Sequence, residues 1–267
     1  MKNPLPSSTV KPTWDALILA AGRGPADPVA SAFGVTHKCL LAVAGKPMLQ
    51  RVAAALLESG RFRSIGVSVE DPSVLAPALG PLLDRVKPVA ADRSASLSVA
   101  AAVRAIPLQE PVLVTTADHP LLRNEIINEF LDRSAATGAD LTVGLATAEV
   151  ILSAYPAVRR TFWTFGRVRV SGCNLYGFNT PAARKILDHW HRVENDRKRP
   201  WRLVQSFGFV PLLRYALGTL TLDAAFAAVS RTLGLKVEPV LLPFAEGAID
   251  VDKPSDLELA ERILAGA

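Results

Sequence analysis

The chain lacks the features of several protein classes. Of its 267 residues only two are cysteines, Cys39 and Cys173, and neither belongs to a Cys-x-x-Cys pair. Two cysteines can form at most one disulfide bond, which is too few to stabilise a chain of this length, and no zinc ribbon or redox motif is present. Aromatic residues make up only 6% of the chain, too few for a series of base-stacking platforms. We therefore expect a fold held together by its apolar core, in a reducing compartment.

Excess charge and long apolar runs are also scarce. Thirty lysines and arginines against 25 aspartates and glutamates leave a net charge of +5, which suits an anionic ligand better than nucleic acid. The longest apolar stretch, residues 207–229, is interrupted by Arg214 and Asp223, and the first 14 residues lack the apolar segment of a secretory signal. We expect a cytoplasmic protein with no stable membrane insertion and no nucleic-acid partner.

What the chain has is apolar sequence, 49% of its residues, in short strands and helices that alternate. The expected strands are 15–20, 64–69, 86–90, 111–116 and 140–145, and the expected helices are 47–58, 96–105 and 123–137. In the first helix Pro47 would occupy the first turn. This alternation predicts an α/β fold with a mostly parallel, mixed sheet and helices on both faces.

The pattern changes after about residue 150. We expect a hairpin over 160–170 that turns at Phe165-Gly166, a strand at 171–178, a helix at 181–193, two or three short helices in 201–233, a strand at 236–242 and a helix at 255–264. Ser255 would be the N-cap of the last helix, with Glu258 at the capping-box position.

A glycine loop directly follows the first strand, with the sequence Leu-Ala-Ala-Gly-Arg-Gly at residues 19–24. Small residues there let a ligand approach the backbone, whose amides can bind phosphates or a base. The loop lacks the third glycine and immediate helix of a dinucleotide fingerprint, and the Gly-Lys-Ser/Thr of a P-loop. A turn that simply needs glycine is the alternative.

Three aspartates stand out later in the chain. Asp118, in Thr-Ala-Asp-His-Pro-Leu, follows a predicted parallel strand, where α/β sheets place ligands and where a hard oxygen donor suits Mg²⁺. Asp250 and Asp252, in Ile-Asp-Val-Asp-Lys-Pro, precede the last helix and would share one face of an extended segment. Helix capping is the alternative for Asp118, for Asp252 and for the nearby Asp256. His119 is expected to be an exposed loop residue.

These stretches, with Lys38 and Ala-Gly-Lys-Pro-Met-Leu at residues 44–49, resemble the nucleotidyltransferase superfamily. That superfamily includes MobA-like molybdenum-cofactor nucleotidyltransferases, sugar-1-phosphate nucleotidyltransferases and methylerythritol-phosphate cytidylyltransferase. Its loop usually reads Gly-x-Gly-Thr-Arg-Met and leads to Pro-Lys, whereas here Thr-Arg-Met is missing and His37 precedes Lys38. The resemblance covers the first 150 and the last twenty residues well, and residues 150–244 hardly at all.

The resemblance implies a Rossmann-like, GT-A-like nucleotide-diphospho-sugar transferase fold and one nucleotidyltransferase domain over 1–267. Residues 1–150 would be its nucleotide-binding half, 151–245 its acceptor-side part, and 246–267 its closing metal-ligand segment and helix. Arg23, Lys38 and Asp118 would be catalytic. The implied metal ligands for Mg²⁺ are Asp118 and Asp250, with Asp252 the alternative to Asp250. The implied nucleotide contacts are Leu19, Ala20, Ala21, Gly22, Arg23, Gly24, Lys38, Ser94, Ser96 and Ser98.

The implied reaction moves a nucleoside monophosphate from an NTP, with CTP weakly favoured, to a phosphorylated small-molecule acceptor. Asn174 and Arg169 are the candidate acceptor contacts. Other arginines, such as Arg159 and Arg160, are either acceptor contacts or solvated surface. Two alternatives remain: a glycosyltransferase of the related fold, which normally has Asp-x-Asp where this chain has Thr116-Ala117-Asp118, and a non-catalytic nucleotide-binding protein, which the missing Thr-Arg-Met would favour.

Overall fold

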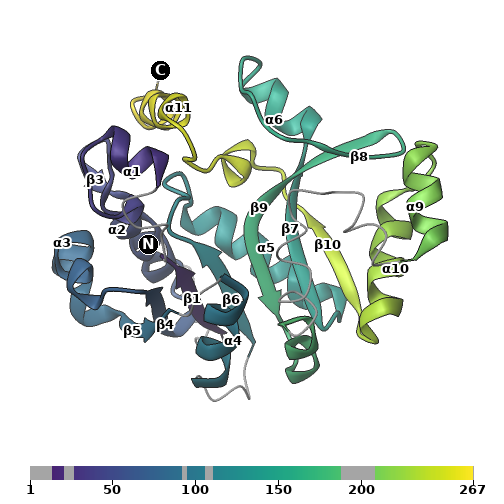
Figure 1. Cartoon of the computed structure of the whole chain (residues 1–267), viewed down its shortest axis with the longest axis horizontal. Coiled ribbons are helices and arrows are strands. Elements are labelled where there is room, and N and C mark those ends of the chain that lie inside the picture. Colours follow the sequence, from purple (N-terminus) through teal and green to yellow (C-terminus); the bar gives the residue numbers. More distant parts are fainter. Residues whose placement is uncertain (1–13, 21–26, 92–94, 106–110, 188–207, 267) are drawn as a thin grey trace, which may run out of the picture.

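The computed structural model describes residues 14–20, 27–91, 95–105, 111–187 and 208–266. One eight-stranded sheet runs through the molecule, and its strands follow the order β10-β7-β9-β6-β1-β4-β5, with β8 paired to β9 (Figure 1). The strands are β1 (Trp14–Leu19), β4 (Phe62–Val69), β5 (Lys87–Ala90), β6 (Val112–Thr116), β7 (Leu141–Thr147), β8 (Trp163–Phe165), β9 (Val168–Phe178) and β10 (Val237–Leu241). A separate two-stranded ribbon pairs β2 (Ala42–Val43) with β3 (Lys46–Pro47).

Helices cover both faces of the sheet. The α-helices are α1 (Pro28–Ala32), α2 (Met48–Glu58), α3 (Leu75–Leu79), α4 (Ala95–Ala105), α5 (Asn124–Thr137), α6 (Ala148–Ala154), α9 (Phe209–Ala216), α10 (Leu222–Leu233) and α11 (Pro254–Leu264). Short 3-10 helices are η2 (Lys38–Leu40), η3 (Pro72–Val74), η4 (Gly80–Arg85), η5 (Pro181–Arg184) and η7 (Ala245–Ala248). In the part of the chain that the structure describes, no helix is both long and apolar enough to span a bilayer.

The first strand explains why the sequence is so apolar. Ala16 and Ile18 pack in a core cluster with residues of α2 and α5, whereas Leu17 packs on the opposite face with residues of α4. All three side chains are fully buried. A strand covered on both faces is apolar over most of its length, which is typical of a parallel sheet. The predicted fold class, including helices on both faces, is confirmed.

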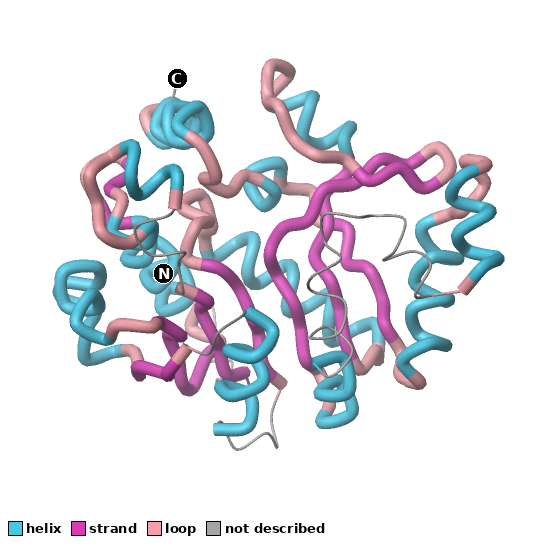
Figure 2. The backbone as a smooth tube through the Cα atoms, in the orientation of Figure 1, coloured by secondary structure: helices cyan, strands magenta, loops and turns pink. Residues whose placement is uncertain are grey.

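β9 makes the sheet mixed. It runs antiparallel to both β6 and β7 and joins the parallel strands β1, β4, β5 and β6 to the parallel pair β7 and β10. The expected hairpin is confirmed, with β8 and β9 on either side of Gly166 (Figure 2). The separate strand expected at 171–178 is instead the continuation of β9, which runs from Val168 to Phe178 as one strand.

Several expected helix boundaries are wrong by a residue or two. Pro47 is the N-cap of α2 and not part of its first turn, because it still pairs with Ala42 in the β2–β3 ribbon. The N-cap of α11 is Lys253, and Asp256, not Glu258, accepts the backbone hydrogen bond of the capping box. Within the expected helix at 181–193, residues 181–184 form η5, and the residues after 187 lie outside the described part.

Candidate functional site

Lys38 lies between two of the predicted aspartates. Its ammonium donates to Asp118 Oδ2 and to Asp252 Oδ1, each at 2.7 Å. The side chains of Lys38 and Asp118 are 14% and 23% exposed, whereas that of Asp252 is 68% exposed, so one edge of this triad is open to solvent. Burial by itself would lower the pKa of Lys38, but the charges and hydrogen bonds of Asp118 and Asp252 raise it above 10.5. Lys38 is therefore held in its charged form.

Asp118 is positioned by the end of β6. Asp118 lies two residues after that strand, and its Oδ1 accepts a hydrogen bond from Thr116 Oγ1 at 2.6 Å. Its backbone carbonyl accepts a hydrogen bond from the amide of Val251 at 2.9 Å. The second bond ties the closing segment of the chain to the carboxyl end of a central strand, the edge where α/β sheets bind ligands.

The entry to α11 positions Asp252. The buried Asp256 accepts from the backbone amides of Asp252 and Lys253, at 3.0 and 3.1 Å. These bonds satisfy donors at a helix N-terminus, which otherwise lack partners. Asp256 therefore caps the helix, which is the alternative that the sequence analysis gave for this residue. The side chain of Asp252 does not cap the helix and is directed to Lys38.

Asp250 belongs to a second cluster. Its carboxylate pairs with the guanidinium of Arg160 and accepts from Asn174 Nδ2 at 3.2 Å. Arg160 and Asp250 are 12% and 16% exposed. Burial would raise the pKa of Asp250, but the hydrogen bond and charge of Arg160, helped by Asn174, hold it below 3.8. In this structure Asp250 pairs with Arg160, whereas Asp252 shares Lys38 with Asp118. That Asp118 and Asp250 hold a cation together stays a prediction.

A bulge in β9 directs Asn174 into this cluster. Val143 and Leu145 of β7, two positions apart, pair with Tyr176 and Gly172 of β9, four positions apart, so the register shifts there. Asn174 lies inside that stretch with φ 50°. Asn tolerates the left-handed conformation better than most residues, and bulges beside sites often re-aim a side chain.

His119 is buried, so the expectation that it is an exposed loop residue is wrong. The imidazole is fully enclosed beside Asp118 and Asp250, and burial lowers its pKa below 6.5. A neutral ring is the form that an enclosed site favours. Cys173 is also fully buried, and its pKa is raised to about 12 by burial, so its thiol is not a nucleophile.

The other predicted residues divide into two groups. Leu19 and Ala20 lie at the end of β1, and Ser98 is fully buried in α4. Ser96 belongs to the same helix. The remaining glycine-loop and serine positions lie outside the described residues: Ala21, Gly22, Arg23, Gly24 and Ser94. The nucleotide contacts at these positions stay predictions.

Arg169 does not join Asn174. Its guanidinium stacks over the ring of Phe162 at 5.3 Å and lines an open cavity beside α6. The arginine that does reach the site is Arg160, from the loop that follows α6. Sequence reasoning placed it among arginines that are acceptor contacts or surface. Its partner is 90 residues away in the chain, so no local pattern marks it out.

The donor set fits a divalent cation bound together with phosphates. Among the residues that the structure describes, no three His, Cys, Asp or Glu side chains form a metal cluster. Mg²⁺ usually takes only one or two carboxylates and completes its shell with water and substrate phosphates. Asp118 and Asp252 could supply two hard oxygen ligands, and both carboxylates already pair with one cationic group, the Lys38 ammonium.

Comparison with known proteins points to one family. The family model of the MobA-like NTP transferase domain matches residues 16–208. A hypothetical transferase from Thermus thermophilus is 31% identical, with a TM-score of 0.76 over 91% of this chain and 99% of that one. The bifunctional protein GlmU of Exiguobacterium sibiricum is 32% identical over 142 residues, which are 50% of this chain but only 29% of GlmU.

Two more distant structures share the fold. CMP:2-keto-3-deoxy-manno-octonic acid synthetase, solved with CTP, is 14% identical with a TM-score of 0.58 over 95% of this chain and 99% of its own. A 4-diphosphocytidyl-2C-methyl-D-erythritol synthase from Anaerococcus prevotii is 13% identical with the same TM-score, over 94% of this chain and 98% of its own. Because the family model covers more than half of the chain, the chain belongs to the MobA-like NTP transferase family and is a nucleotidyltransferase.

Proposed function

We propose that the enzyme transfers a nucleoside monophosphate from an NTP, with CTP favoured, to a phosphorylated small-molecule acceptor in a Mg²⁺-dependent reaction. An oxygen of the acceptor phosphate forms a bond to the α-phosphorus, the bond from that phosphorus to the bridging oxygen breaks, and pyrophosphate leaves. No covalent protein intermediate is needed, so positioning and charge stabilisation carry the catalysis. The observation that supports this reaction is the Lys38 ammonium held between Asp118 and Asp252 at the carboxyl edge of the sheet.

Each residue of the site would have its own role in the proposed reaction. Asp118 and Asp252 would hold Mg²⁺, which neutralises charge on the phosphates that it contacts. Lys38, released from the two carboxylates, would contact the phosphates of the leaving pyrophosphate. Thr116 and Asp256 keep the two carboxylates in place through the hydrogen bonds described above. Arg160 and Asn174 hold Asp250 and so position the loop that carries Asp252.

The test is a pyrophosphate assay. The protein is incubated with each NTP, Mg²⁺ and a panel of phosphorylated sugars and polyols. We expect one nucleotide to give faster pyrophosphate release than the others. In Asp118→Asn the rate of release should fall about 10²–10³-fold, because a charged contact made in the transition state is removed. Full activity of Asp118→Asn would refute the metal assignment. Asp223→Asn, an exposed aspartate on α10, is the matched control.

A further inference from the structure

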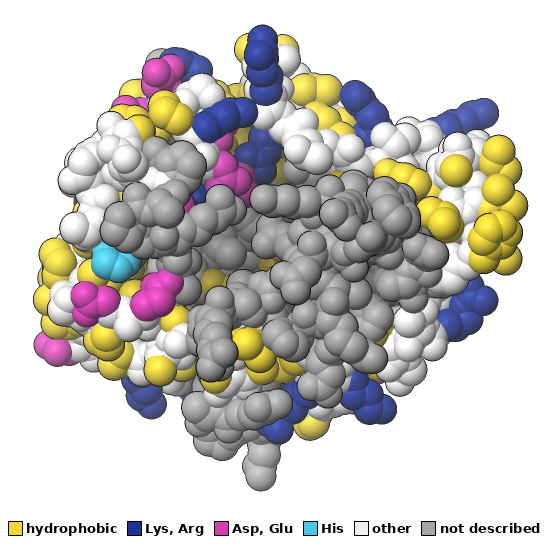
Figure 3. Space-filling model, viewed as in Figure 1, with side chains coloured by type: hydrophobic (Ala, Val, Ile, Leu, Met, Phe, Trp, Pro, Cys, Tyr) yellow, Lys and Arg dark blue, Asp and Glu magenta, His cyan; other side chains and the backbone are white. Residues whose placement is uncertain are grey.

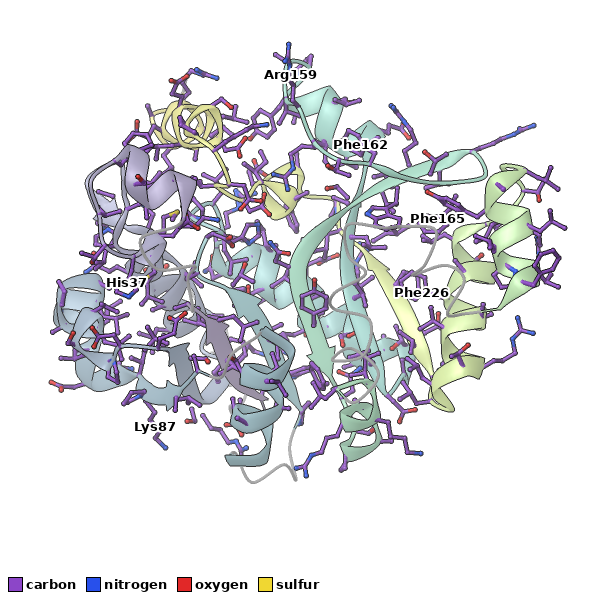
Figure 4. The ribbon with its side chains drawn as sticks, in the orientation of Figure 1. His37, Lys87, Arg159, Phe162, Phe165 and Phe226 are labelled. Atoms are coloured by element: carbon purple, nitrogen blue, oxygen red, sulfur yellow. The ribbon has the colours of Figure 1, made fainter. Side chains whose placement is uncertain are left out.

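A second cavity lies on the acceptor side of the sheet. Its volume is about 400 Å³, and it is bounded by β7, the β8–β9 hairpin, α9, α10 and the turn between those helices. The largest lining side chains are those of Trp163, Phe165, Tyr176 and Phe226. Phe165 and Phe226, labelled in Figure 4, come from β8 and α10 and lie in the region between the sheet and the two helices. This size is in the range of small-molecule binding pockets.

The described part of the lining is almost entirely apolar. Of the thirteen described residues that line the cavity, only Trp163 and Tyr176 carry a polar side-chain atom. A sugar or polyol placed there would give up hydrogen bonds to water with few partners in exchange, which costs free energy for each hydroxyl group. An aryl or alkyl group would instead gain from leaving water. The lining therefore selects an apolar ligand.

Strand β9 passes from the wall of the cavity to the candidate site. Gly172 and Tyr176 line the cavity, and Asn174, between them in the same strand, donates to Asp250 in the site. Two residues of a strand span at most about 7 Å, so the backbone of Asn174 lies within that distance of both wall residues. A small molecule whose phosphate lies at the site can therefore place its body in the cavity.

We propose that the cavity binds an apolar aryl or alkyl group of the acceptor, so that the substrate is an organic phosphate with an apolar body and not a simple sugar phosphate. This inference rests on the proposed nucleotidyl transfer, since that reaction places the acceptor phosphate at the site. It names the class of acceptor, which the transferase family by itself does not.

Binding of n-alkyl phosphates to the full-length protein tests the proposal without turnover. Titration calorimetry with ethyl, butyl and hexyl phosphate should show affinity rising roughly fourfold for each added methylene group, the value expected when each group leaves water for an apolar cavity. Equal affinity for ethyl and hexyl phosphate would overturn the proposal.

Gly172→Val fills the cavity. A Cβ atom at Gly172 meets nothing within 4 Å, and the residue does not have a positive φ, so the variant should fold. We expect the ratio of hexyl to ethyl phosphate affinity to fall at least tenfold. The control is Ala136→Val, which places a valine on the exposed side of α5, away from the cavity, and should keep the wild-type ratio. An unchanged ratio in a folded Gly172→Val protein, checked by circular dichroism, would also overturn the proposal.

The two proposals can fail separately. Chain-length-dependent binding that Gly172→Val abolishes, with no pyrophosphate release from any NTP, would support the apolar cavity and refute the proposed reaction. Pyrophosphate release with sugar phosphates, and no dependence of binding on alkyl chain length, would support the reaction and refute the apolar acceptor.

Discussion

At the scale of single residues, Arg160 and Asp250 form an ion pair from which water is largely excluded. Such a pair contributes little net stability compared with two apolar residues, but removal of one partner leaves the other charge buried and unpaired. The pair therefore affects the free energy of unfolding most when one partner is removed. An exposed arginine next to Arg160 in the chain allows this effect to be separated from the general loss of an arginine.

We expect Arg160→Ala to lower the free energy of unfolding by about 3–5 kcal/mol, because Asp250 would stay buried without its cation. Arg159→Ala is the control, since Arg159 is exposed and should change stability by less than about 0.5 kcal/mol (Figure 4). Urea denaturation measures both. In a double-mutant cycle, Asp250→Asn should recover part of the loss; purely additive effects would contradict a direct pair.

The pH dependence of stability follows from the same carboxyl group. Since the folded-state pKa of Asp250 lies below 3.8, the unfolded chain binds more protons as the pH falls through that region. The stabilisation is present above about pH 4 and is lost as the pH falls toward the folded pKa, with a slope of at most about 1.4 kcal/mol per pH unit. Denaturation at pH 5, 4 and 3 should show a shallower loss for Asp250→Asn than for wild type. An equal slope would contradict the assignment, and Asp223→Asn is the exposed control.

At the scale of elements, the N-terminus of α11 sets the position of Asp252. The capping box predicted from the sequence used Ser255 and Glu258, but the helix begins two residues earlier and Asp256 receives both backbone donors. Pro254 explains the shift, because proline has no amide to satisfy and its fixed φ suits the first helical position.

We expect Asp256→Ala to lower the free energy of unfolding by about 1–2 kcal/mol, the usual cost of losing a helix cap. The variant should also need more Mg²⁺ for half-maximal activity, since the backbone of Asp252 is no longer held. Glu258→Ala removes an exposed carboxylate from the next turn and should have neither effect. Equal effects of the two substitutions would show that charge near the helix, and not the cap, matters. Thermal denaturation and Mg²⁺ titrations provide the two measurements.

At the scale of the whole molecule, the site joins parts of the chain that are far apart in sequence. Lys38 follows α1, Asp118 follows β6, and Asp252 precedes α11. A ligand that holds these parts together should therefore stabilise the entire fold by mass action. The molecule also exposes apolar side chains on α9, namely Phe209, Val210 and Leu213, and at the C-cap residue Leu217, at the right edge of Figure 3.

An NTP added with Mg²⁺ should therefore raise the melting temperature of the protein, most strongly when the NTP is CTP. Thermal-shift measurements with each NTP test this. At a hundredfold excess over its dissociation constant, one nucleotide stabilises by about 2.7 kcal/mol. In Asp118→Asn the part of the shift that depends on Mg²⁺ should disappear. A larger shift with another NTP would overturn the preference for CTP, and no shift with any NTP would contradict the proposed nucleotide site.

The sequence by itself determined the fold class and the class of enzyme. Apolar runs such as Ala16–Ile18 predict buried parallel strands because strands covered on both faces cannot alternate with polar residues. Asp118 was assigned correctly to the carboxyl end of a central strand, because strand, turn and helix signals are local. Near a helix start, local signals were less accurate, as Pro47 and Ser255 show.

Only the tertiary structure decided which charges meet. The sequence pattern favoured Asp250 as the second metal ligand and kept Asp252 as the alternative. In the structure Arg160 pairs with Asp250 and Lys38 with Asp252, across 90 and 214 positions of the chain. His119 was expected in solvent and is buried, since the closing segment containing Gly247 and Asp250 packs against it. Pairing at such separations depends on how the sheet and its crossovers bring the segments together, and no short-range propensity carries that information.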